Sequence, residues 1–315
     1  MPILTESEYH YHLLNEDGYT RLTALANGVG WKEALDSFST SFNKHIRREF
    51  LYYLDDDKSP YWKFLLPLPA NSRVLDLGCG WGGFSVDLAK SFREVVAMDA
   101  SFGRVKLLQL RGLQDEIPGL VAVCGGNAKF LPFPSGYFDL VVINGVLEWA
   151  PTSRAGDPQE IQENLLKEAY RVLRPGGILY LGIENRFGYE FLLGHRDPHT
   201  GLRWVNVLPR SVANLYSKLV RGEEFREYTQ SYWGLKRMFR KAGFSKIDFY
   251  TPYRHYNHFE KFLPLDNPAI LKRWVFLLED GRKFRARRRR LLFRLLANFR
   301  IFKLFAYHYG VIATH

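Results

Sequence analysis

The sequence predicts an α/β protein with a mostly parallel sheet and helices on both faces of that sheet. Between residues 72 and 187, short apolar runs rich in β-branched residues alternate with segments of helical periodicity. This alternation is typical of a parallel sheet with crossover helices. The first run leads into a glycine-rich loop and the second ends in an aspartate, which together indicate a nucleoside-binding site at the carboxyl ends of the strands.

Seven strands are expected in all. Five lie in the alternating region, at 73–77, 94–99, 120–123, 138–143 and 178–183. Two more, at 246–250 and 305–313, complete the sheet. The helix before the fifth strand has the clearest boundary, because Asp157 can cap it and Pro158 suits its first turn.

Three parts of the chain do not follow this alternation. The first 70 residues are expected to form a helical N-terminal extension, with one helix over 31–54. Residues 71–315 then form the α/β domain, with insertions at about 185–228 and 252–304. Insertions at the carboxyl ends of parallel strands usually shape a substrate pocket.

The net charge of +11 is concentrated near the end of the chain. Residues 281–315 hold ten Lys and Arg residues and no acid, so residues 1–280 carry a formal charge of only +1. This distribution predicts one local contact and no nucleic-acid partner. A helix over 282–303 has arginines opposite an apolar stripe, which fits peripheral contact with an anionic membrane or packing on the domain with a solvated basic face.

No apolar run is long enough to span a bilayer, and the first residues do not have the pattern of a signal peptide. The two cysteines, Cys79 and Cys124, cannot form a disulfide framework. We therefore expect a cytoplasmic protein, with attachment at the inner membrane face as the alternative.

The loop after the first strand contains Gly78, Gly80 and Gly83. Their spacing also satisfies the dinucleotide pattern G-x-G-x-x-G, so the loop alone does not distinguish the cofactors. Asp76, just before the loop, would repel a pyrophosphate and favour a cationic amino acid group. Asp99 ends the second strand and can accept hydrogen bonds from both hydroxyls of a ribose, which fits either cofactor.

Five segments in this order resemble the class I S-adenosylmethionine-dependent methyltransferases, in particular the methyltransferase type 11 group related to quinone-biosynthesis enzymes. They are residues 75–82, 95–99, 126–133, 138–147 and 171–177. The resemblance is close over about 70–190 and looser over 229–315. It implies a Rossmann-like class I methyltransferase fold, S-adenosylmethionine as cofactor, and in-line methyl transfer to a small-molecule or glycosidic acceptor. Residues 185–204 also resemble a loop of bacterial methyltransferases that act beside cell-surface polysaccharide enzymes, which favours a sugar, or a lipid-linked sugar, as acceptor.

The resemblance also implies which residues bind the cofactor. The expected set is Asp76, Gly78, Cys79, Gly80, Asp99, Ala100, Asn127, Ala128 and Asn144. In the family, the glycine loop holds the methionine portion, Asp99 the ribose, and Asn127 with Ala128 the adenine. The family usually has Asp where Asn127 stands, so the affinity for the cofactor is expected to be weaker or altered.

Catalytic and substrate residues are expected at the ends of later strands. Glu148 is the first candidate for a general base and His195 the second, since Trp149 stands where many relatives have a histidine. Substrate contacts are expected from Glu184, Asn185 and Arg186. Arg186 could instead pin the first insertion.

No metal site is expected from the sequence. His195, Asp197 and His199 have the residue types of metal ligands, but Pro198 interrupts any helix that would align them. Two other functions remain open at this point. One is a catalytically silent scaffold that binds the cofactor, and the other is an NAD-dependent oxidoreductase.

Overall fold

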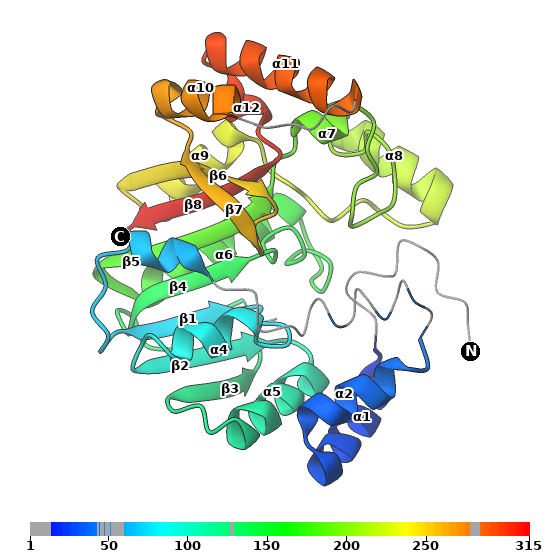
Figure 1. The fold of residues 1–315 in the computed structure, drawn as a ribbon, viewed down its shortest axis with the longest axis vertical. Helices are drawn as coiled ribbons and strands as arrows, with labels where there is room; N and C mark the ends of the chain where they lie inside the picture. Colours follow the sequence, from blue (N-terminus) through cyan, green and yellow to red (C-terminus); the bar gives the residue numbers. More distant parts are fainter. Residues whose placement is uncertain are drawn as a thin grey trace.

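The computed structural model describes residues 14–42, 44, 47, 51, 60–126, 129–277 and 284–315, and its core is one eight-stranded sheet with helices on both faces (Figure 1). The strand order is β3-β2-β1-β4-β5-β8-β6-β7. The α/β class and the mostly parallel sheet are confirmed. The expected number of seven strands is wrong by one.

The parallel part of the sheet holds the five strands of the alternating region. They are β1 (Arg73–Leu77), β2 (Glu94–Asp99), β3 (Leu120–Cys124), β4 (Phe138–Asn144) and β5 (Leu173–Glu184). β1 pairs with β2 and β4, β2 with β3, and β4 with β5, all in parallel register. The carboxyl ends of β1, β2 and β4 therefore lie next to one another at one edge of the sheet.

The remaining strands are antiparallel to their neighbours. β8 (His308–Thr314) lies between β5 and β6 (Lys246–Arg254) and pairs antiparallel with both. The additional strand is β7 (Phe259–Pro264), which forms a hairpin with β6 inside the predicted insertion 252–304. In the dinucleotide-binding order 3-2-1-4-5-6 the sixth strand lies directly beside the fifth, whereas here β8 lies between β5 and β6.

Helices cover both faces of the sheet. α4 (Gly83–Ala89) and α5 (Phe102–Gln114) lie on one face, and α6 (Pro158–Val172) packs with α9 (Tyr232–Ala242) on the other. The capping prediction for α6 is confirmed, because the Asp157 side chain accepts a hydrogen bond of 3.0 Å from the Glu160 amide. Short-range rules predict α6 well since its cap and its apolar stripe are both local.

The N-terminal segment contains α1 (Glu16–Val29), α2 (Trp31–Ser39) and the 3₁₀ helix η2 (Tyr61–Leu65). The expectation of one helix over 31–54 is wrong, because α2 ends at Ser39. The hydroxyls of Ser39, Thr40 and Ser41 all donate to carbonyl groups three residues earlier. Such bonds compete with those that continue a helix.

The two insertions are mainly helical. The first contains α7 (Tyr189–Leu192) and α8 (Arg210–Arg221). The second region contains α10 (Pro268–Leu277), α11 (Phe284–Asn298) and α12 (Phe302–Phe305), which lie at the end of the molecule near β6 and β7 (Figure 1).

The basic helix α11 packs on the domain. Phe293, Leu296 and Ala297 are buried in the main core, whereas Leu295 and Phe299 are exposed. The apolar stripe that helical periodicity predicts consists of Leu292, Leu295, Leu296, Phe299 and Phe302, so it is only partly buried. Arg282 and Lys283 lie outside the described residues, so contact of 282–303 with a membrane stays a prediction. Among the helices that the structure describes, none combines the length and the apolar character needed to cross a bilayer.

Candidate functional site

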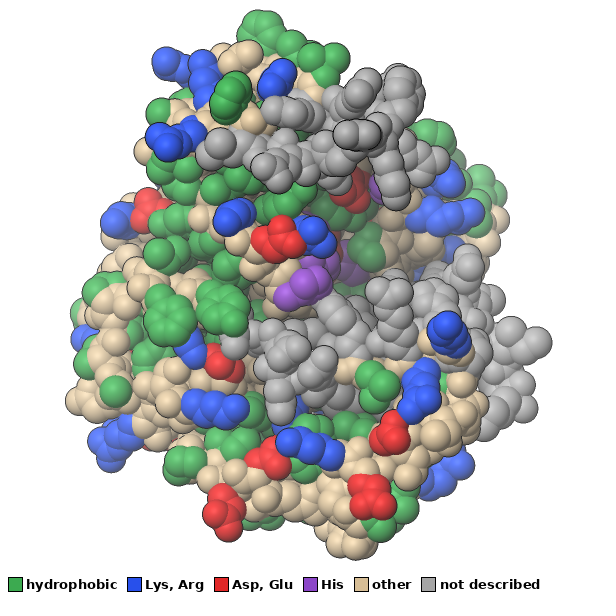
Figure 2. Space-filling model, in the orientation of Figure 1, with side chains coloured by type: hydrophobic (Ala, Val, Ile, Leu, Met, Phe, Trp, Pro, Cys, Tyr) green, Lys and Arg blue, Asp and Glu red, His purple; other side chains and the backbone are tan. Residues whose placement is uncertain are grey.

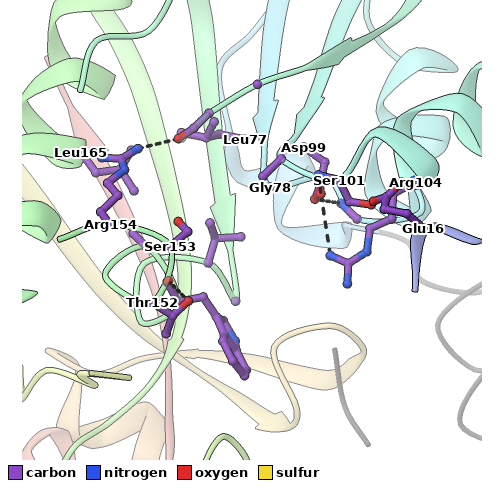
Figure 3. A pocket seen from close by; sticks show the side chains of 18 of the residues that line it. Glu16, Leu77, Gly78, Asp99, Ser101, Arg104, Thr152, Ser153, Arg154 and Leu165 are labelled. Atoms are coloured by element: carbon purple, nitrogen blue, oxygen red, sulfur yellow. Dashed lines mark hydrogen bonds and ion pairs between the residues drawn. The ribbon is translucent and has the colours of Figure 1, made fainter. Parts of the chain in front are cut away.

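A pocket of about 460 Å³ opens at the carboxyl ends of β1, β2 and β4. Gly78 and Asp99 line one side of it, and Thr152 and Arg154 line the opposite side (Figure 3). The volume lies within the usual range for sites that bind one small molecule. This edge of the sheet is where the sequence predicts a nucleoside.

The loop from β1 into α4 is held against β2. The amides of Gly78 and Cys79 both donate to the Met98 carbonyl, at 2.7 and 3.0 Å. Gly78 and Gly80 have φ values of +75° and +57°, which favour glycine. A Cβ on Gly80 would meet no atom within 4 Å, whereas a Cβ on Gly78 would lie 2.3 Å from Val146 Cγ2. Gly80 therefore exposes backbone to the pocket, and Gly78 permits the loop to pack closely against Val146.

This difference predicts opposite defects for two alanine substitutions. Gly80→Ala is expected to lower the free energy of unfolding by only about 1 to 2 kcal/mol, the cost of a left-handed alanine. Its methyl group enters the open space of the pocket, so we expect nucleoside affinity to fall more than about tenfold. Gly78→Ala is expected to cost about 2 to 4 kcal/mol because of the overlap with Val146. Chemical denaturation and calorimetric titration measure both effects, and unchanged affinity in Gly80→Ala would contradict this orientation of the loop.

Asp99 is fixed by the loops on both sides of it. Its Oδ2 accepts from the Gly80 amide at 2.9 Å, and its Oδ1 accepts from the Ser101 amide at 2.9 Å. Arg104 Nη1 lies 3.7 Å from Oδ1 (Figure 3). The carboxylate is almost fully buried yet lines the pocket together with Ala100. It is therefore oriented to accept hydrogen bonds from a ligand in the pocket.

Three other predicted cofactor residues do not line the pocket. Asp76 is buried beneath the loop and accepts a 2.5 Å hydrogen bond from Ser85 Oγ, and burial raises its pKa to about 6. Burial also raises the pKa of the Cys79 thiol, which lies 3.7 Å from the Gly80 carbonyl oxygen. Asn144 donates to Asn257 Oδ1 at 2.6 Å. The remaining two predicted residues, Asn127 and Ala128, lie outside the described residues.

Helix α1 forms a wall of the pocket that the sequence analysis missed. Glu16 accepts from Ser101 Oγ at 2.7 Å and from the Gly103 amide at 2.9 Å, at the start of α5. The Tyr19 hydroxyl accepts from Trp81 Nε1 at 2.7 Å. No local motif predicts these contacts, since each of them joins residues more than 60 positions apart.

Arg154 is a second residue that the sequence analysis did not assign. It lies in the loop after β4, and its Nη2 donates to the Gly126 carbonyl at 2.5 Å. Its Nε is buried and has no hydrogen-bond partner among the described residues. Burial lowers the pKa of the guanidinium, and it faces the pocket opposite Asp99 (Figure 3).

The two predicted general bases lie outside the set of residues that line the pocket. Glu148 is fully buried, with His199 Nε2 at 3.7 Å from its Oε1. Its neighbour Trp149 lines the pocket and packs against the His199 ring, with centroids 5.0 Å apart. The His195 side chain is 60% exposed and pairs with Glu190 at 3.4 Å.

The predicted substrate residues make internal contacts. Asn185 donates to the carbonyls of Leu304 and Ala306. Arg186 donates to the carbonyls of Asn206 and Leu208 at 2.9 and 2.8 Å, which favours the alternative that it pins the insertion. Burial raises the pKa of Glu184 to about 7. None of these three side chains is among the described residues that line the pocket.

Comparison with known proteins identifies the family. The family model described as a methyltransferase domain matches residues 75–181. A demethylmenaquinone methyltransferase of Lactiplantibacillus plantarum is 32% identical over 188 residues, which are 58% of this chain and 74% of that enzyme. This chain belongs to the S-adenosylmethionine-dependent methyltransferase family.

A second curated relative agrees with this assignment. A ubiquinone biosynthesis O-methyltransferase of Xanthomonas oryzae is 33% identical over 175 residues, 54% of this chain and 69% of that enzyme. A solved S-adenosylmethionine-dependent methyltransferase from Thermotoga maritima covers 88% of this chain and 97% of its own at 18% identity, with a TM-score of 0.47. The family model and the curated relatives confirm the predicted family, enzyme class and cofactor, and they do not favour the silent scaffold or the NAD-dependent oxidoreductase.

The pocket fits S-adenosylmethionine, the cofactor of this methyltransferase. Gly80 leaves room for close approach of a ligand to the backbone, and the Asp99 carboxylate is available for ribose hydroxyls. When bound, the cofactor supplies a methyl group on a positively charged sulfur, which is a strong electrophile. The residues of this chain then have to bind the nucleoside, orient the acceptor and exclude water.

Proposed function

We propose that this methyltransferase transfers the methyl group to a small, largely apolar acceptor that carries a hydroxyl or another acidic nucleophile. The observation that carries the proposal is that one pocket contains both the cofactor loop and a second wall. Val146, Trp149 and Ala150, which follow β4, supply apolar surface to that wall, and Leu14 adds apolar surface to the pocket beside Tyr19. Thr152 and Ser153 add hydroxyl groups.

The relatives support an acceptor of this class. They include enzymes named for demethylmenaquinone, for ubiquinone biosynthesis and for 27-O-demethylrifamycin SV. What these acceptors share is that each is a small molecule, and that shared class supports the proposal for this chain. The glycosidic acceptor expected from residues 185–204 stays a prediction, since Arg186 and Asn185 hold the insertion in place.

The proposed reaction is an in-line displacement that the enzyme accelerates by positioning the acceptor against the methyl group. Among the described acids, Glu16 and Asp99 line the pocket, and both already accept two hydrogen bonds. Glu148 and His195 do not line the pocket, so neither acts as the general base in the proposed reaction. An acceptor such as a phenol or a quinol fits this arrangement, because it loses its proton to water far more readily than an aliphatic hydroxyl does.

Product analysis by mass spectrometry tests the proposal. The purified chain is incubated with S-adenosylmethionine carrying a deuterated methyl group and with a catechol, a naphthoquinol and an alkyl glycoside. We expect label in the aromatic acceptors.

Trp149→Ala is expected to lower kcat/KM for the acceptor about tenfold or more with little change in cofactor affinity, because Trp149 lies on the apolar wall.

Trp233→Ala is the matched control, since Trp233 is 60% exposed and does not line the pocket. Label in the glycoside alone would contradict the proposed acceptor class. Cofactor binding without transfer to any acceptor would instead support the silent scaffold.

A further inference from the structure

Three buried side chains from distant parts of the chain meet behind Trp149. Glu148 follows β4, Glu184 ends β5, and His199 lies in the first insertion. His199 Nε2 is 3.7 Å from Glu148 Oε1 and 3.8 Å from Glu184 Oε2. One ligand atom of each residue lies within 4.8 Å of those of the other two. Neighbouring ligand atoms around a divalent metal with bonds of about 2.1 Å are about 3 to 4 Å apart, so the cluster is close to that spacing.

The imidazole of His199 is oriented by a carboxylate. Its Nδ1 lies 3.1 Å from Asp197 Oδ1, which leaves Nε2 to face the two glutamates. Asp197 is held in turn by the Thr200 amide and hydroxyl, both at 2.8 Å, and by Asn206 Nδ2 at 2.6 Å. A histidine that binds a metal commonly donates its other N–H to a carboxylate in this way.

The two glutamates supply oxygens that lack other partners. Tyr256 donates its hydroxyl to Glu184 Oε1 at 3.1 Å, but Glu184 Oε2 is buried without a hydrogen bond. Neither oxygen of Glu148 has a hydrogen-bond partner in the described chain, and the residue is 0% exposed. Three buried carboxylates, including Asp197, thus surround a single imidazole ring. A divalent cation between Glu148 and Glu184 would contact the buried oxygens that have no hydrogen-bond partner in the described chain.

We propose that Glu148, Glu184 and His199 form a binding site for one divalent transition metal ion of the zinc class. Imidazole and carboxylate ligands together suit such an ion better than Mg²⁺. Three protein ligands leave at least one coordination position for water or another oxygen ligand. The ion would join the insertion, the end of β5 and the loop that carries Trp149, and so fix one wall of the pocket.

A second group of possible ligands shares Glu184. It adds His255 and His308, again with ligand atoms within 4.8 Å of one another. Histidine side chains are visible at the hollow near the centre of the face shown in Figure 2. His255 Nδ1 accepts from the Asn257 amide at 3.1 Å, which places its proton on Nε2. The first group is favoured because its histidine has a carboxylate partner and because Glu148 has unpaired oxygens.

Metal binding to the full chain tests the proposal without reference to catalysis. The protein is stripped with a chelator, and ZnCl₂ is titrated by calorimetry in the absence of cofactor. We expect one equivalent to bind and the melting temperature to rise with zinc concentration. Glu148→Gln and Glu184→Gln should each lower zinc affinity more than about 100-fold, and Asp197→Asn about 10- to 100-fold, because it acts through His199.

His195→Gln is the matched control, since His195 lies in the same insertion but is exposed and pairs with Glu190. It should bind zinc as the wild type does. X-ray absorption of the zinc-loaded wild type should show one imidazole among oxygen ligands, and this measurement decides the question if a glutamine variant fails to fold. No zinc binding by the wild type, binding unchanged in both glutamine variants, or preference for Mg²⁺ would overturn the proposal.

Discussion

Replacing Asp99 with alanine is expected to weaken S-adenosylmethionine binding by a factor of about 10² to 10⁴. Asp99 is the carboxylate at the end of β2 that lines the pocket. A hydrogen bond to a charged group contributes about 1.5 to 3 kcal/mol, and a ribose offers two hydroxyls to this side chain. Isothermal titration calorimetry with the cofactor product, S-adenosylhomocysteine, measures the loss directly.

A loss of affinity has this meaning only if the loop keeps its shape. Asp99 also accepts from the amides of Gly80 and Ser101, so Asp99→Asn, which keeps the side-chain volume and one oxygen acceptor, should retain more affinity than Asp99→Ala. Asp248→Ala is the control, because Asp248 is partly exposed on β6, pairs with Lys246 and does not line the pocket. Affinity in Asp99→Ala within threefold of the wild type would remove the assignment of Asp99 to the ribose.

The parts of the fold that sequence predicts well are those fixed by neighbours along the chain. β4 is a nearly continuous apolar run buried in the sheet, and α6 combines its own cap with its own apolar stripe. The glycine loop is of the same kind, since Gly78 and Gly80 have the positive φ values that their residue type permits. Local sequence therefore predicted the conformation of the glycine loop and its position at the pocket, whereas the cofactor contacts of the individual residues stay predictions.

The parts that sequence does not predict depend on contacts between distant segments. Apolar and polar residues do not alternate regularly along β7, so the sequence does not predict a strand there. The strand is defined by its pairing with β6. Glu16 reaches the pocket because α1 packs on α5, which no motif in residues 1–70 indicates. Glu148 had the residue type of a base, but the insertion that carries His199 covers it. The sequence analysis considered His195, Asp197 and His199 as metal ligands, whereas the ligands proposed from the structure, Glu148, Glu184 and His199, are 36 and 15 positions apart.

Replacing Trp62 with alanine is expected to lower the free energy of unfolding by about 3 to 5 kcal/mol, the usual cost of removing a fully buried tryptophan. Trp62 lies in η2, is 0% exposed, and stacks on Tyr180 of β5 with centroids 3.7 Å apart and planes at 9°. Its ring also contacts Phe84 of α4, so it fills the space between that helix and the sheet. Urea denaturation followed by circular dichroism measures the change.

Two control variants distinguish the loss of packing from other effects. Trp62→Phe is expected to cost much less, about 1.5 kcal/mol or less, because Trp62 Nε1 has no hydrogen-bond partner among the described residues and a smaller ring still covers Tyr180. Phe64→Ala should change stability by less than about 0.5 kcal/mol, since Phe64 is 75% exposed in the same helix. A large loss in Trp62→Ala would mean that residues 60–66 fold as part of the sheet domain, so that a division at residue 70 would cut through its core. An unchanged midpoint in Trp62→Ala would instead favour the separate N-terminal extension that the sequence predicts.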